Sequence, residues 1–77
     1  MTNAMPMPSD NTFRAVFALE AEIRDLESAI ADDRCTLRAD ACDENRSGSM
    51  LVALASDIAR NEKRLAALRE TLTVIAN

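Results

Sequence analysis

Residues 51–75, LVALASDIARNEKRLAALRETLTVI, decide the fold of this chain. Their large aliphatic side chains recur in alternating steps of three and four, and only Asn61 interrupts the series. An α-helix completes one turn in 3.6 residues, so this spacing places the whole series on one stripe of a single helix. The members of the stripe are Leu51, Leu54, Ile58, Leu65, Leu68, Leu72 and Ile75.

A second stripe with the same spacing lies upstream, in residues 10–43, which contain no Gly or Pro. Assigning Val16 to heptad position a and Leu19 to d carries the pattern through the segment, with Asp33 in one of the later d positions. Phe13 and Phe17 fall at positions e and b, where we expect them to cover a flank of the core; the alternative is an exposed docking patch. The apolar members of this stripe are Val16, Leu19, Ile23, Leu26, Ile30 and Leu37.

The polar run DENRSGS at residues 43–49 separates the two stripes. Gly48 is expected to adopt the left-handed conformation of a turn, and Ser47 or Ser49 to cap the next helix. We therefore predict a helix over about 10–43, a turn over about 44–48 and a helix over about 49–76, all within one domain, 9–77. Residues 1–8, MTNAMPMP, are predicted to be a disordered tail, with Ser9 as the first N-cap.

The two stripes match each other if the chain folds back at this turn. Facing residue numbers then add to a constant, and each a position meets a d position, as an antiparallel coiled coil requires. Asp33 and Asn61 fall in adjacent layers, so we expect a hydrogen bond between them. The predicted fold is all-α: a two-helix antiparallel coiled-coil hairpin whose seam consists of Val16, Leu19, Ile23, Leu26, Ile30, Asp33, Leu37, Leu54, Ile58, Asn61, Leu65, Leu68, Leu72 and Ile75.

One alternative is a single continuous coiled-coil helix, because the heptad keeps its phase across the predicted turn. Against it, Asp40, Glu44 and Ser47 occupy consecutive seam positions and Gly48 follows them. Consecutive polar seam residues followed by a glycine would destabilise the middle of a continuous coiled-coil helix. The hairpin is the preferred interpretation.

The composition predicts a non-catalytic protein. The chain has no His and a single Gly, and it contains no phosphate-binding loop or nucleophile motif, so we expect no catalytic residues, cofactor or metal site. The net charge of −4 argues against nucleic acid as a partner. No apolar run is long enough to span a membrane and no secretory signal is present, which predicts a cytoplasmic location.

The two cysteines, Cys35 and Cys42, are predicted to be free thiols; the alternative is an intermolecular disulfide or a thiol sensor. Seven residues of helix separate them by about 10 Å along the axis, which is too far for a mutual disulfide.

The second helix carries small apolar residues over an arc wider than one partner helix can cover. A lone hairpin of this length is marginally stable, so we expect a second interface on this side. Two hairpins packed together would form a four-helix bundle. The candidate partner or dimer interface comprises Phe13, Phe17, Val52, Ala59, Ala66, Ala67 and Val74.

These features predict a small cytoplasmic protein–protein interaction module, such as an adaptor, an assembly factor or a small chaperone or co-chaperone subunit. Its partner would be a second copy, giving a homodimer, or a larger protein. The alternative is an acidic regulator, of the nucleic-acid-mimic or anti-repressor type, that binds a basic protein surface. Residues 1–44 carry ten acids and four Arg, a net −6, whereas residues 45–77 carry three acids and five bases, a net +2. The identity of the partner and the biological process stay open.

Overall fold

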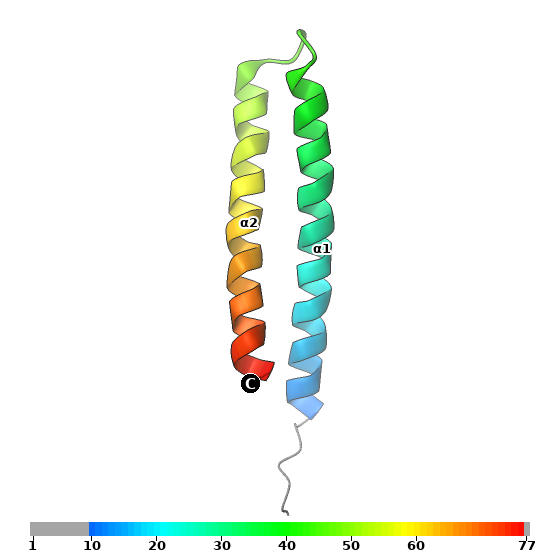
Figure 1. The fold of residues 1–77 in the computed structure, drawn as a ribbon, viewed down its shortest axis with the longest axis vertical. Helices are drawn as coiled ribbons and strands as arrows, with labels where there is room; N and C mark the ends of the chain where they lie inside the picture. The colour runs from blue at the N-terminus through cyan, green and yellow to red at the C-terminus, as the bar shows by residue number, and fades with distance from the viewer. Residues whose placement is uncertain (1–9, 77) are drawn as a thin grey trace, which may run out of the picture.

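The chain folds into two α-helices that lie side by side and run in opposite directions (Figure 1). A computed structural model describes residues 10–76, with side chains from Thr12 onward. Helix α1 spans Asp10–Ala41 and helix α2 spans Gly48–Ala76. The predicted all-α hairpin is confirmed, and the continuous rod is wrong. The predicted tail, residues 1–8, and the predicted cap, Ser9, lie outside the described residues.

Helix α1 ends at Ala41 rather than at residue 43 because the chain tightens there. The Cys42 N–H donates to the Ala39 carbonyl at 3.2 Å, and the Asp43 N–H donates to the Asp40 carbonyl at 3.0 Å. Both bonds span three residues instead of four, which is the usual tightening of a final helical turn.

Asp43 organises the connection between the helices. Its Oδ1 accepts a hydrogen bond from the Asn45 N–H at 2.9 Å, and its carbonyl accepts one from the Arg46 N–H at 3.1 Å. The Arg46 Nε lies 3.6 Å from the Asp40 carboxylate and 3.7 Å from that of Asp43. An Asp side chain that bonds the backbone two residues ahead fixes a turn without help from glycine.

Gly48 does not play the predicted role. It is the first residue of α2, and no residue in the described part of the chain has a positive φ. The expectation of a left-handed glycine is wrong because Asp43 has already turned the chain several residues earlier. Of the two predicted caps, Ser47 and Ser49, the first acts: the Ser47 Oγ accepts a hydrogen bond from the Met50 N–H at 3.2 Å.

The core is a single layer of aliphatic side chains between the helices. Leu68 is its most buried residue at 5% exposure, and no side chain falls below 2% in the described part of the chain. A helix that touches one neighbour buries only one stripe, so the two sides of the layer stay near solvent. The buried residues are Ile23, Ile30, Ile58, Leu65 and Leu68, and Leu19, Leu26, Leu37, Leu54 and Leu72 pack partly buried against them.

The layer opens at the end of the hairpin away from the turn. Val16 is half-buried, and Ile75 is 37% exposed. Helix α1 extends beyond the end of α2 here (Figure 1). The first turn of α1 therefore has no partner helix across from it.

Candidate interaction surface

Two ion pairs mark one side of the hairpin. Arg69 donates to Glu27, and Arg34 donates to Glu62, in both cases across the two helices. All four residues occupy heptad position e, and in an antiparallel pair the e positions of the two helices meet along the same side of the seam. We call this side, made of the e and b positions of both helices, the groove face.

A third ion pair marks the opposite side. Arg64 donates to Glu22 at 3.1 Å, and both residues occupy position g. We call this side, made of the g and c positions, the reverse face. Each pair joins residues about 7.5 Å apart along the axis in the predicted register, and the offset of the groove-face pairs is opposite in direction to that of the reverse-face pair. The two offsets therefore centre on the predicted register.

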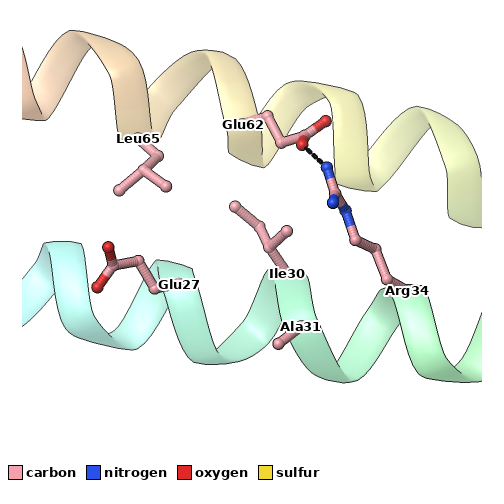
Figure 2. Close-up of a pocket in the computed structure, with 6 residues that line it drawn as sticks. All are labelled: Glu27, Ile30, Ala31, Arg34, Glu62 and Leu65. Atoms are coloured by element: carbon pink, nitrogen blue, oxygen red, sulfur yellow. Dashed lines mark hydrogen bonds and ion pairs between the residues drawn. The ribbon is translucent and has the colours of Figure 1, made fainter.

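The groove face is hollowed near the middle of its length. Figure 2 shows Ile30 and Leu65 pointing into the space between the helices, while Arg34 reaches across to Glu62 beside them. The depression has a volume of about 330 Å³ and is open to solvent. Its floor is apolar and its rim is charged, with a lining of Glu27, Ile30, Ala31, Arg34, Glu62 and Leu65.

Large apolar side chains are exposed at both ends of the groove face. Phe13 is 48% exposed and Phe17 is 67% exposed near one end, and Val52 is 66% exposed near the other. The expectation that the two phenylalanines cover a flank of the core is wrong. Position b points away from the single partner helix, and α2 ends at Ala76, before the level of Phe13 in this register.

The candidate interface predicted from the sequence divides between the two faces. Ala59 and Ala66 are exposed at position b, on the groove face with Phe13, Phe17 and Val52. Ala67 and Val74 are exposed at position c, and Val74 is 71% exposed. Positions b and c lie about 100° apart on a helix, so the contact with α1 separates them onto opposite faces.

Met50, 53% exposed at position g, also lies on the reverse face, although it is absent from the predicted interface. Its heptad position, adjacent to the apolar c positions of α2, is the signal that identifies it.

Asp33 and Asn61 are both half-buried, and no hydrogen bond joins them. The expected bond across the seam is therefore wrong. With only two helices, each polar side chain sits at an open edge of the layer where water can solvate it. Consistent with this, the described part of the chain contains no buried side-chain polar atom without a partner.

The remaining chemistry of the surface is sparse. Cys35 and Cys42 are free thiols, and both are exposed. Residues 10–76 hold no group of three or more His, Cys, Asp or Glu side chains that could bind a metal ion. Neither described helix has the length and apolar character needed to cross a membrane.

Comparisons with protein-family models, curated proteins and solved structures found no match for this chain. Its function must therefore be inferred from the surface that the two helices present.

Proposed function

We propose that this protein is a small helical interaction module that packs its groove face against another protein. The observation that carries the proposal is the exposure of Phe17 and Val52, at 67% and 66%, on a hairpin with no fully buried side chain among residues 12–76. Burying one large apolar side chain contributes about 1.5–3 kcal/mol. Covering the groove face would therefore add substantially to a thin core.

The shape of this face suits a helix better than a small ligand. The depression over Ile30 and Leu65 is shallow and open, whereas small-molecule sites enclose most of the ligand surface. Ala59 and Ala66 repeat at position b beside it, and such small side chains let a partner helix approach closely. An adaptor, an assembly factor or a small chaperone subunit would use a surface of this kind, without a catalytic residue.

The acidic-regulator alternative ranks lower because part of the charge on α1 is already engaged. Glu22 and Glu27 bind Arg64 and Arg69 of α2. A basic partner would have to compete with these internal pairs. We therefore assign the main role to the apolar groove face rather than to the acidic surface of α1.

A matched pair of double variants tests the proposal. Ala59→Glu with Ala66→Glu places two carboxylates on the groove face, and Ala53→Glu with Ala67→Glu places two on the reverse face of the same helix. All four positions are exposed alanines, so the intrinsic cost to the helix is the same.

We expect the groove-face variant to lose association, measured as solution mass and as cross-linking to partners in cell extract, while circular dichroism shows both variants folded. The reverse-face variant should associate like the wild-type protein. Equal association by both variants would contradict the proposal.

A further inference from the structure

We propose that the partner of the groove face is a second copy of this chain, packed about a two-fold axis that crosses the helices at mid-length. This inference rests on the proposed function and names its partner. In such a dimer, α1 lies against α1 of the other copy and α2 against α2, and every neighbouring pair of helices is antiparallel. The product is a four-helix bundle with the groove faces inside.

The position of the groove fits this axis. In the register of the facing aliphatic residues, the middle of the helix–helix contact is level with Ser28 on α1 and Lys63 on α2. Ile30 and Leu65, which form the floor of the groove, lie within about 3 Å of this level along the axis, at a rise of 1.5 Å per residue. Two copies related by this axis therefore superimpose their grooves and overlap along their whole contact length.

The exposed apolar side chains are placed symmetrically about the same level. Phe17 lies about 16 Å from it toward one end, and Val52 lies about 16 Å from it toward the other. The two-fold axis thus brings Phe17 of one copy level with Val52 of the other, at both ends of the bundle. Ala59 and Ala66 lie about 6 Å and 4 Å on either side, so the small residues of the two α2 helices also meet.

The charges on the groove face of α1 are complementary under this rotation. Glu20 lies about 12 Å from the middle toward the amino end, whereas Arg34 and Arg38 lie about 9 Å and 15 Å toward the turn. Glu20 of one copy therefore falls between these two arginines of the other. Neither Glu20 nor Arg38 has an ion-pair partner among residues 12–76, so both are available for the contact.

The remaining charges on this face are compatible with the dimer. Glu27 and Glu62 lie about 1.5 Å from the level of the axis, so each comes near its own counterpart in the other copy, but each is already paired with an arginine of its own chain. Arg24 comes level with Ala31 of the other copy, whose small side chain leaves room for the aliphatic stem of the arginine.

A two-fold axis parallel to the helices fits the charges less well. It would place α1 of one copy over α2 of the other and bring Glu20 level with Arg69. Arg69 already donates to Glu27 within its own chain, as Arg34 does to Glu62, and the groove face of α2 offers no unpaired arginine comparable to Arg38 among the described residues. It would also leave Phe17 level with Thr73 and Val52 level with Ala39, so the exposed large side chains would no longer meet. The crossing axis alone brings Glu20 beside the unpaired Arg38 and places Phe17 level with Val52.

A charge exchange in the purified full chain tests the dimer. Sedimentation equilibrium over a wide range of concentrations should give a mass of twice 8.4 kDa for the wild-type protein. Glu20→Arg and Arg38→Glu each replace two attractive contacts per dimer with repulsive ones, and each should raise the dimer Kd about tenfold or more. The double variant E20R/R38E should recover the wild-type Kd, and an equimolar mixture of the two single variants should form a heterodimer. Asp25→Arg is the matched control, because it makes the same charge change on the reverse face and should leave the Kd unchanged.

Three results would overturn the inference: a folded wild-type protein that stays monomeric, single variants with the wild-type Kd, or rescue of Glu20→Arg by Arg69→Glu instead of Arg38→Glu.

A second probe is independent of these charges. In a C35S/C42S background, Ala59→Cys and Ala66→Cys chains should cross-link to each other on mild oxidation. If the wild-type chain is monomeric but the Ala59→Glu/Ala66→Glu variant still loses cross-linking to another protein, the proposed function stands and the second-copy inference fails.

Discussion

The Arg34 guanidinium on α1 donates a hydrogen bond to the Glu62 carboxylate on α2, which joins the helices beside the groove. The two side chains are 56% and 43% exposed, so solvent screens their attraction. We expect Arg34→Ala or Glu62→Ala to lower the free energy of unfolding of the hairpin by about 0.2–1 kcal/mol. A double-mutant cycle in urea denaturation measures the coupling, which should shrink at high salt. A coupling well above this range, or one that salt leaves unchanged, would show that the pair is shielded from solvent.

Leu68 is the most buried residue of the core, whereas Ile75 is 37% exposed at the open end. We expect Leu68→Ala to cost about 2–5 kcal/mol of unfolding free energy because it removes buried methyl groups and leaves a cavity. Ile75→Ala, which truncates a side chain that already contacts water, should cost well under half as much. Thermal and urea denaturation followed by circular dichroism give both values. Equal costs would mean that the open end is covered in solution.

Gly48 starts α2 without a positive φ, and a Cβ added there would meet no heavy atom within 4 Å. Gly48→Ala should therefore raise the free energy of unfolding by about 0.4–1 kcal/mol, mainly by restricting the unfolded chain. Ser47→Ala, one residue earlier, should have the opposite sign and cost about 0.5–2 kcal/mol through loss of the cap. The midpoints of urea denaturation test both changes. Destabilisation by Gly48→Ala would indicate that Gly48 adopts the left-handed turn conformation that the sequence suggested.

Asn61 is half-buried within an otherwise aliphatic stripe, and its side chain has no hydrogen-bond partner among the described residues. We expect Asn61→Leu to raise the thermal midpoint of the hairpin, since an apolar side chain there would extend the packed layer. Asn61→Ala, which removes the amide without adding apolar area, should give a smaller change. A lower midpoint for Asn61→Leu would indicate that the amide binds a group outside the described residues.

The helices and their register could be predicted because aliphatic spacing reports directly on helical geometry. Val16 and Leu19 set a phase that Leu68 and Leu72 match in the opposite direction, and this agreement favoured a hairpin, although the unbroken heptad also allowed a continuous helix. The breakdown of the pattern at Asp40 similarly located the turn.

The details of the turn and of the surface were harder to predict. Gly48 and Asp43 both favour turns, and only the hydrogen bond from the Asn45 N–H to Asp43 shows which of them acts. The exposure of Phe17 depends on how many helices surround α1, which the periodicity of one helix does not specify. In the sequence, the b and c positions of α2 appear to form one continuous apolar arc. The direction in which α2 contacts α1 places the b positions on the groove face and the c positions on the reverse face.

The single-layer core allows the two helices to separate progressively from one end. Each pair of facing core residues contacts only the pairs directly above and below it, so the hairpin can open stepwise rather than as a whole. Opening should begin at the end where Ile75 is exposed and stop short of the turn, which Asp43 and Arg46 hold closed. Amide protection against hydrogen exchange should therefore fall gradually from the middle of the hairpin toward Ala76, with no sharp boundary between folded and unfolded segments.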